Sequence, residues 1–490
     1  MYSFFLKKIV MPLSYRLSKN KGWQYYQKYI DSEYHSLEDR KRRQWEKLKR
    51  ILHHAYYNVP FYRRKFDEAN IKPENVKTKD DFKKIPITTK RELMRNFPQN
   101  VIAKNYSLKN LRFSNTSGAS GRFLMLANDH EDINHKYAAK LRSRYLMGVN
   151  IGESILRISP NECQPCLPDG TSPSIGLFSY LWTILTNKKY KSQAYYIFME
   201  KKLVNPLLHR RKTLSPLGVK LHNEDLRWYI EMIKKYNPRI LTGYPLYLYL
   251  LARYMEENSI SPFGCKVVDL TGGSSTKWMR DFIGEKFGAP VYQIYGSCEF
   301  GRVASECQQS LGLMHILEDF CYVEFIKNTG EEAKPKELAN IIITSLTNYA
   351  MPLIRYECQD VGWYDLKSCG CGRTTKLMYV EGRLQDLIIT NDGKVLTTHF
   401  FLEKFLNYPG IRLFQLLQYR GDRFEFRIVR RDNANIDTVR LKNILYELLG
   451  KRVQIEINFT DYIKPQPSGK YRLVRSSTYE KFRCIMDPNF

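Results

Sequence analysis

A short stretch early in the chain, TSGASG at residues 116–121, has the residue types of a loop that binds phosphate. Its glycines would let backbone N–H groups approach an anion closely, and its hydroxyls would add donors. The residues that would supply these donors are Thr116, Ser117, Gly118, Ser120 and Gly121. Such clusters are more often ordinary turns, and Arg122 and Phe123 stand where a Walker loop would end in Gly-Lys-Ser/Thr. The stretch alone leaves both interpretations open.

Cysteine and histidine form a second group with chemical potential. Cys307 and His315 lie in SECQQSLGLMH, and Cys369 and Cys371 lie in SCGCG. Three thiolates and one imidazole make a tetrahedral zinc site when folding brings them together. The spacing is not that of a familiar zinc finger, and Cys358 competes as a ligand. A structural zinc site and unligated cysteines are therefore the two alternatives.

Apolar strands that end in glycine turns are the elements that would position such residues. KVVDLTGGSST and PVYQIYGSCEFG each have this form, with a helix predicted over 277–287 between them. This rhythm predicts an α/β sheet with functional residues at strand ends. Further helices are expected over 38–58, over 131–148 and from Asn223 to a stop before Pro238. The last hundred residues alternate strand and helix as a small α+β unit.

Length and charge limit the function classes. A chain of 490 residues corresponds to roughly two to four domains. The net charge of +28, from 78 basic and 50 acidic residues, favours anionic partners such as nucleotides, acidic sugars or anionic lipid. Most of these charges are spread along the chain, as on an ordinary solvated surface, and no nucleic-acid-binding motif is found among them. We therefore expect no nucleic-acid partner.

The cellular location follows from what the sequence contains. No apolar run is long enough to cross a bilayer, and the first residues, MYSFFLKKIVMPLSYRL, make a poor signal peptide because Lys7 and Lys8 interrupt them. Clustered cysteines without a signal segment are typical of the reducing cytoplasm. The expected location is cytoplasmic, with an amino-terminal amphipathic helix at the inner face of the membrane as an alternative.

Five stretches in a definite order resemble a known family. They are TSGASG (116–121), LTGGSS (270–275), IYGSCEFG (294–301), PLIRYECQDVG (352–362) with EGRLQD (381–386), and KPQPSGKYR (464–472). This series is similar to the adenylate-forming superfamily of acyl-CoA synthetases. Within it, the chain more closely resembles the phenylacetate–CoA ligase family and its capsular-polysaccharide-associated branch. The resemblance covers most of the chain, from about residue 38 to 475.

The resemblance implies an α/β architecture with two domains. A large amino-terminal adenylation domain would span 1–382, and a mobile α+β lid domain would span 383–490 and carry Lys470. Such enzymes join ATP and a carboxylic acid into an acyl-adenylate with release of pyrophosphate. A thiol, usually coenzyme A, or less often an amine or hydroxyl, then takes the acyl group. The resemblance thus implies ATP and Mg²⁺, and leaves coenzyme A and the acceptor open.

The resemblance also implies roles for individual residues. Residues 116–121 would wrap the triphosphate, and Glu299 would hold Mg²⁺. The residues expected to bind AMP are Gly272, Gly273, Tyr295, Gly296, Ser297, Asp360 and Arg383. Among them Tyr295 would stack on adenine, and Asp360 would accept hydrogen bonds from the ribose hydroxyls, because a carboxylate has only acceptors to offer.

Lys470, in PSGKYR, is the main catalytic candidate. A lysine on a separate lid could reach the α-phosphate and the attacking carboxylate and stabilise charge in the transition state. Two positions depart from the family pattern. Arg122 stands where relatives usually have lysine, and Gln385, followed by Asp386, stands where the hinge usually has an acidic residue. The resemblance implies that the lid rotates between the half-reactions, and the hinge is where this sequence departs from the family pattern.

The identity of the acid is least determined by the sequence. By position, Tyr137, Tyr244 and Pro245 are candidates for the acyl pocket, with core packing as the equal alternative. The segment 149–215 departs from the aromatic-acid ligases, which argues against phenylacetate itself. A small carboxylic acid that is polar or linked to a sugar, or transfer to a glycan acceptor in surface-polysaccharide assembly, fits the basic surface better.

Two other function classes remain open. One is a catalytically silent relative that binds nucleotide and serves as a scaffold in polysaccharide assembly, although Glu299, Asp360 and Lys470 are all present. The other is a peripheral membrane protein that acts through its basic surface. The sequence names neither the acid nor the oligomeric state.

Overall fold

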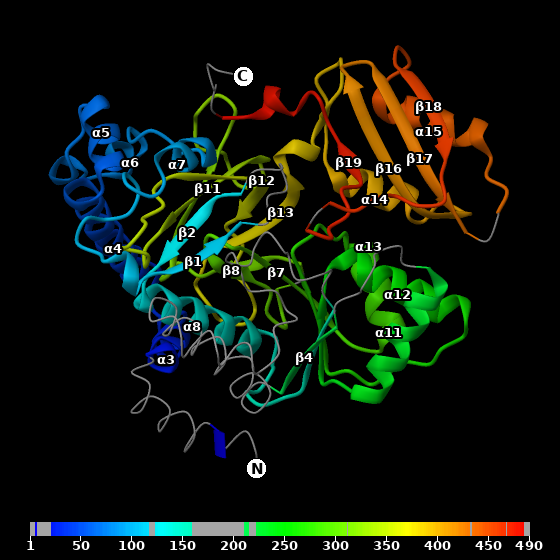
Figure 1. Ribbon diagram of the computed structural model, residues 1–490, viewed down its shortest axis with the longest axis horizontal. Helices are drawn as coiled ribbons and strands as arrows, with labels where there is room; N and C mark the ends of the chain where they lie inside the picture. The colour runs from blue at the N-terminus through cyan, green and yellow to red at the C-terminus, as the bar shows by residue number, and fades with distance from the viewer. Residues whose placement is uncertain are drawn as a thin grey trace, which may run out of the picture.

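The structure is a computed structural model that describes residues 5–6, 21–116, 123–158, 210–214, 222–310, 312–431, 434–466 and 468–484. Its two main sheets have eleven and four strands. In Figure 1 the large sheet occupies the centre, and the small sheet, in orange at the upper right, is built from carboxy-terminal strands. This mixed α/β architecture agrees with the predicted fold class.

The large sheet changes character at β7. Its strand order is β10-β11-β12-β13-β9-β8-β7-β6-β5-β3-β4. Neighbours from β4 to β7 are parallel, and neighbours from β7 to β10 are antiparallel. The strands are β3 (Ile155–Ile158), β4 (Arg211–Leu214), β5 (Ile240–Gly243), β6 (Val267–Thr271), β7 (Val291–Ser297), β8 (Gly301–Ser305), β9 (Met314–Ile316), β10 (Cys321–Ile326), β11 (Ala339–Ser345), β12 (Tyr356–Asp365) and β13 (Leu377–Arg383). Because parallel strands end at one edge, the glycine turns after β6 and β7 lie together.

Two groups of helices support the large sheet. In Figure 1, α11 (Asn223–Tyr236), α12 (Pro245–Glu257) and α13 (Lys277–Phe287) lie beside its parallel half. On the other side α8 (His130–Leu146) packs against β8. The remaining helices include α3 (Gly22–Ser32), α4 (Leu37–Asn58), α5 (Pro60–Glu68), α6 (Lys79–Lys83), α7 (Lys90–Asn96), α14 (Thr398–Phe405) and α15 (Thr438–Leu449). The predicted helices α4, α8, α11 and α13 are thus confirmed to within one or two residues.

The carboxy-terminal sheet has the strand order β18-β17-β16-β19. Its strands are β16 (Ile411–Arg420), β17 (Arg423–Arg430), β18 (Gln454–Phe459) and β19 (Val474–Arg475). Leu413 and Phe414 of β16 belong to the same apolar core as Leu248 and Leu251 of α12. The small sheet is therefore packed against the parallel half of the large one.

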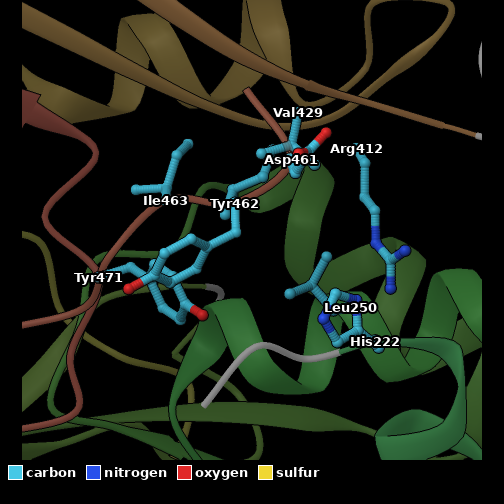
Figure 2. A pocket seen from close by; sticks show the side chains of 9 residues that line it. His222, Leu250, Arg412, Val429, Asp461, Tyr462, Ile463 and Tyr471 are labelled. Carbon is cyan, nitrogen blue, oxygen red and sulfur yellow. The ribbon is translucent and has the colours of Figure 1, made fainter. Parts of the chain in front are cut away.

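A small pocket marks the boundary between the two parts (Figure 2). Leu250 of α12 and His222 lie on one side of it, and Arg412, Val429 and Tyr462 lie on the other. Among the described residues, no helix is long and apolar enough to cross a membrane.

Candidate active site

The predicted phosphate loop connects two short paired strands, β1 (Arg112–Asn115) and β2 (Met125–Asn128). Thr116 closes their end, because its backbone N–H donates to the Leu124 carbonyl at 3.0 Å and its Oγ1 accepts from the Leu124 N–H at 3.0 Å. The other members of the loop, Ser117, Gly118, Ser120 and Gly121, lie outside the described residues. Phosphate binding by this loop stays a prediction.

Asp360 is held between two neighbours that the sequence also singled out. The Tyr295 hydroxyl donates to Asp360 Oδ2 at 2.8 Å, and Arg383 Nε lies 3.1 Å from Asp360 Oδ1. Asp360 and Arg383 face one another across the β12–β13 pair. Burial raises the pKa of Asp360, and the Arg383 guanidinium opposes this rise. Each carboxylate oxygen has one partner here, which leaves acceptor capacity on both.

Glu299 lies in the turn between β7 and β8, and the Tyr356 hydroxyl donates to its Oε1 at 3.4 Å. Lys90, the first residue of α7, lies close enough for Glu299 to raise its pKa, although burial lowers that pKa overall. Lys90 was missed in the sequence because it belongs to a segment far from the five motifs. The capping residue Thr89 predicts where the helix begins. It does not predict which residues lie near Lys90 in the folded protein.

The two glycine turns allow close approaches that a side chain would block. Gly272 has φ +83°, and a Cβ there would lie 2.3 Å from Tyr244 Cε1. A Cβ on Gly296 would lie 2.0 Å from the Gly301 carbonyl oxygen. Gly273 lies next to Pro245, since a Cβ would stand 3.3 Å from Pro245 Cδ. The acyl-pocket candidates Tyr244 and Pro245 are thus beside the turn after β6.

The remaining predicted residues are more dispersed. Ser297, the last residue of β7, accepts from the Phe300 N–H at 3.4 Å through its Oγ. Tyr137 lies on α8 and packs partly buried against the core formed by the antiparallel half of the sheet.

Lys470 reaches this site from the carboxy-terminal part of the chain. Its Nζ lies 5.0 Å from the centre of the Tyr244 ring, and the Tyr247 hydroxyl donates to the Gly469 carbonyl at 3.0 Å. Burial and, secondarily, the nearby Arg383 guanidinium lower the pKa of Lys470 to about 8, and Asp360 and Glu299 oppose this shift. The structure therefore brings Lys470 together with Glu299, Asp360 and Arg383.

The segment that carries Lys470 is tied to the end of β13. Arg472 Nε lies 2.5 Å from Asp386 Oδ1, and its Nη2 donates to the Gln385 carbonyl at 2.6 Å. Gln385 itself donates from Nε2 to Gln359 Oε1 at 3.3 Å. The residue that departs from the family pattern is thus engaged through its amide, while its neighbour Asp386 makes the ion pair.

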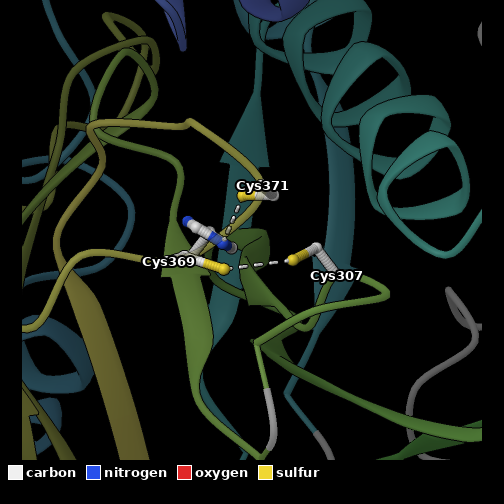
Figure 3. A group of neighbouring side chains, drawn as sticks. Cys307, Cys369 and Cys371 are labelled. Atoms are coloured by element: carbon white, nitrogen blue, oxygen red, sulfur yellow. Dashed lines mark hydrogen bonds between the residues drawn. The ribbon is translucent and has the colours of Figure 1, made fainter.

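The four predicted metal ligands form one cluster (Figure 3). One donor atom from each of Cys307, His315, Cys369 and Cys371 lies within 4.8 Å of all the others. Sulfur atoms of Cys307 and Cys369 are 3.6 Å apart, and Cys371 Sγ is 3.4 Å from His315 Nε2. Three sulfurs and one nitrogen in this arrangement suit a tetrahedral metal ion. Cys358 lies outside the cluster, and its thiol donates instead to the Tyr356 carbonyl at 3.7 Å.

His315 is prepared for this role by its surroundings. Its Nδ1 lies 2.6 Å from Thr375 Oγ1, which turns Nε2 towards Cys371. Such a hydrogen bond to the second ring nitrogen is usual for a histidine that binds metal. Burial lowers the pKa of His315 to about 3, so the imidazole is neutral, and only a neutral imidazole can bind a metal.

The chain is similar in sequence to several known proteins. The phenylacetate–coenzyme A ligase of Pseudomonas putida is 24% identical over 444 residues, which cover 89% of this chain and 92% of the relative. The corresponding enzyme of Thermus thermophilus is 25% identical over 362 residues, or 72% of this chain and 73% of the relative. The CapK C-terminal domain matches residues 388–477. These similarities support the phenylacetate–coenzyme A ligase family and its CapK branch.

Two further similarities concern a shorter relative and the fold. Protein CapK of Staphylococcus aureus is 23% identical over 272 residues, which cover 53% of this chain and 58% of that protein. The fold matches 2-hydroxyisobutyryl-CoA ligase, solved in the postadenylation state with an acyl-AMP, at a TM-score of 0.69 and 19% identity, with 92% of both chains covered. This likeness confirms the predicted fold class. Together, the relatives and the fold support an adenylate-forming ligase.

Arg472→Gln is expected to loosen the segment that carries Lys470. The substitution removes both contacts to the end of β13 and leaves the buried Asp386 carboxylate without its cation. We expect faster hydrogen–deuterium exchange of the Gly469 amide, which donates to the Gln466 carbonyl at 2.7 Å. Arg475→Gln, on the exposed end of β19, is the matched control. Equal exchange in both variants would contradict the role of Arg472.

Proposed function

We propose that the protein is an ATP-dependent ligase that activates a carboxylic acid as an acyl-adenylate and transfers the acyl group to an acceptor. The observation that carries this proposal is the position of Lys470. A lysine from the carboxy-terminal part of the chain lies against Tyr244, at a site that also contains Glu299, Asp360 and Arg383. Opposite charges from separate elements converge there, as a site that binds a charged nucleotide requires.

Each residue would then have a distinct task. Glu299 would hold Mg²⁺, since carboxylate oxygens are the protein ligands that this ion prefers. Asp360 accepts hydrogen bonds from the ribose hydroxyls, and Arg383 keeps its carboxylate in place and ionised. Tyr295 presents its ring to the adenine while its hydroxyl is bonded to Asp360. The glycine turn at Gly272 and Gly273 admits the adenine and the acyl group.

The first half-reaction needs little covalent chemistry from the protein. A carboxylate oxygen of the acid attacks the α-phosphorus of ATP, the bond to the bridging oxygen breaks, and pyrophosphate leaves. The Lys470 ammonium stabilises the negative charge on the phosphorus oxygens and on the attacking carboxylate. An acceptor thiol, amine or hydroxyl then attacks the acyl carbon, loses its proton, and AMP leaves.

The second half-reaction would require the two domains of the chain to move relative to one another. We propose residues 1–382 as the adenylation domain and 383–490 as a lid that rotates between the steps. Gln385 and Asp386 lie at this junction, where the Arg472 contacts hold the lid in the described position. Coenzyme A is the acceptor named for the relatives in the family, and a glycan is the alternative. The likeness to protein CapK supports a role in surface-polysaccharide biosynthesis.

The cysteine–histidine cluster is proposed to bind zinc for a structural purpose. Its four ligands are all contributed by protein, so no position stays open for a substrate. The ion would tie the segment after β8, which carries Cys307, to the loop after β12. That loop follows the strand of Asp360, so the metal would stabilise the framework of the nucleotide site.

ATP–pyrophosphate exchange driven by a pooled library of carboxylic acids tests the proposed reaction. We expect exchange that depends on one pool, and a loss of about 100- to 1,000-fold in Lys470→Ala, the usual effect of removing one charge-stabilising donor. Lys464→Ala is the matched control, because Lys464 is exposed in the same segment. ATP binding without exchange for any acid would instead favour a catalytically silent scaffold.

The rate should also depend on pH through Lys470. The lowered pKa of about 8 means that the ammonium is present below this pH and is lost above it. We expect kcat/KM for ATP in the exchange reaction to fall as the pH rises through about 8, by up to tenfold per pH unit, since this parameter reports groups of the free enzyme. In Lys470→Arg the falling limb should disappear, because a guanidinium stays charged. The same limb in both proteins would assign it to another group.

Metal content tests the zinc proposal independently of activity. We expect the purified chain to carry one zinc ion, and Cys369→Ser to carry substantially less and to unfold at a lower temperature, because metal binding contributes folding free energy. Cys265→Ser is the control, since Cys265 is buried but lies outside the cluster. Elemental analysis and thermal unfolding provide the two readouts. Full zinc retention by Cys369→Ser would exclude this ligand set.

A further inference from the structure

Three arginines from separate elements gather near Asp269 on β6: Arg144 and Arg302 interact with its carboxylate, and Arg157 interacts with Arg302. Arg157 lies on β3, Arg302 on β8 and Arg144 near the end of α8. Arg302 Nη1 donates to Thr271 Oγ1 at 3.3 Å, and its Nη2 lies 4.0 Å from Asp269 Oδ2. Asp269 is only 6% exposed, whereas the three arginines are half-buried. We call Arg144, Arg157, Arg302 and Asp269 the arginine cluster.

The charges of the arginine cluster do not balance. Among the residues that the structure describes, Asp269 is the one carboxylate that acts on Arg144 and Arg302, so the cluster holds one negative charge against three positive ones. Three other arginines that the structure describes as largely buried each have a carboxylate at close range. Those pairs are Arg280–Glu306 at 3.1 Å, Arg355–Glu324 at 3.1 Å and Arg483–Glu357 at 2.7 Å. An excess of partly buried positive charge costs free energy unless an anion joins it.

The pKa shifts of two arginines in the cluster and the hydrogen bonding of Asp269 also reflect this imbalance. Burial lowers the pKa of Arg144 to about 10, with the Arg302 guanidinium as the next cause. Burial also lowers the pKa of Arg302, where Asp269 opposes the shift and Arg157 adds to it. Independently, Asp269 Oδ1 is buried without a hydrogen-bond partner among the described residues. A polar ligand would supply both the missing negative charge and a donor for this oxygen.

The arginine cluster adjoins the site that Lys470 enters. Thr271, which accepts from Arg302, directly precedes Gly272, and Gly272 contacts the Tyr244 ring that lies under Lys470. Arg157 is near Tyr244, since its guanidinium opposes the rise in the tyrosine pKa that burial causes. Tyr137 is likewise near Arg144. Both tyrosines that position alone marked as acyl-pocket candidates therefore lie beside the cluster.

We propose that the acid activated by this protein carries a second anionic group, a carboxylate or a phosphate, which the arginine cluster binds. This inference rests on the proposed function, because it concerns the substrate of the same site. The reacting carboxylate would lie near Lys470, and the second anion would lie near Arg302 and Arg157. Guanidinium groups suit this task, since they stay charged and bind carboxylate or phosphate through two parallel hydrogen bonds.

Matched pairs of acids in the ATP–pyrophosphate exchange assay test the inference. Succinate is compared with butyrate, adipate with hexanoate, and 3-phosphoglycerate with glycerate, so that each pair differs in one anionic group. We expect the wild-type protein to prefer the member with the second anionic group by roughly 10- to 100-fold in kcat/KM, the usual effect of a hydrogen bond to a charged group. Preference within the carboxylate pairs or the phosphate pair identifies which anion is bound.

Arg302→Gln and Arg157→Gln should reduce this preference, whereas Arg63→Gln, at an exposed arginine on α5, should leave it unchanged. The ratio within a pair is the decisive readout, because a variant that merely folds poorly loses activity with both members equally. Arg302→Lys should restore part of the ratio, since it restores the charge but not the paired hydrogen bonds.

The outcomes separate this inference from the proposed function. The inference would be overturned if kcat/KM were equal for the two acids of each pair, or if their ratio were unchanged in both glutamine variants. Either result would leave the proposed ligase activity intact. Bound ATP without exchange for any acid would remove the proposed function and, with it, the substrate inferred here. A high ratio that falls in both variants supports the two together.

Discussion

The buried carboxylate of Asp360 is the group on which the arrangement of the site depends. It receives the Tyr295 hydroxyl from β7 and the Arg383 guanidinium from the end of β13, so one side chain joins three strands. A carboxylate buried with only one of these partners would be costly, because its desolvation must be compensated by charge or hydrogen bonds. Arg383 stands where the large sheet ends and the carboxy-terminal part begins. The same interaction therefore joins the proposed nucleotide site to the start of the carboxy-terminal part of the chain.

The position of Lys470 follows from packing far from its own side chain. Residues of β16 share an apolar core with α12, and Arg472 is bonded to Gln385 and Asp386. Tyr247 of α12 fixes the backbone next to the lysine. These contacts place an ammonium where it is partly desolvated, which lowers its pKa. The desolvation that weakens its charge in the free protein would strengthen its interaction with a phosphate, because both follow from the lower local dielectric constant.

The sequence predicted those features that depend on local pattern or on ordered motifs. Apolar runs that end in glycine turns predicted β6 and β7, a start at Asn223 and a stop before Pro238 predicted α11, and the segment between the two glycine turns predicted α13. The motif order predicted the residues that now lie around Lys470, and the pairs Cys307–His315 and Cys369–Cys371 predicted one cluster. Lys90, Tyr356 and Arg472 could not be found in this way, because each acts through neighbours that are distant in sequence. Their partners are determined by strand order, which no local pattern encodes.

The arginine cluster shows that the local charge of a site indicates its binding partner better than the net charge of the chain does. The net charge of +28 is spread over a surface where water and salt screen each group, so it distinguishes poorly between partners. Arg144, Arg157 and Arg302 are individually unremarkable in the sequence and come together only through β3, β8 and α8. Half-buried, they interact more strongly than exposed charges do, and Asp269 compensates for only one of them. The small positive excess of the arginine cluster thus carries more information about a binding partner than the larger excess on the surface.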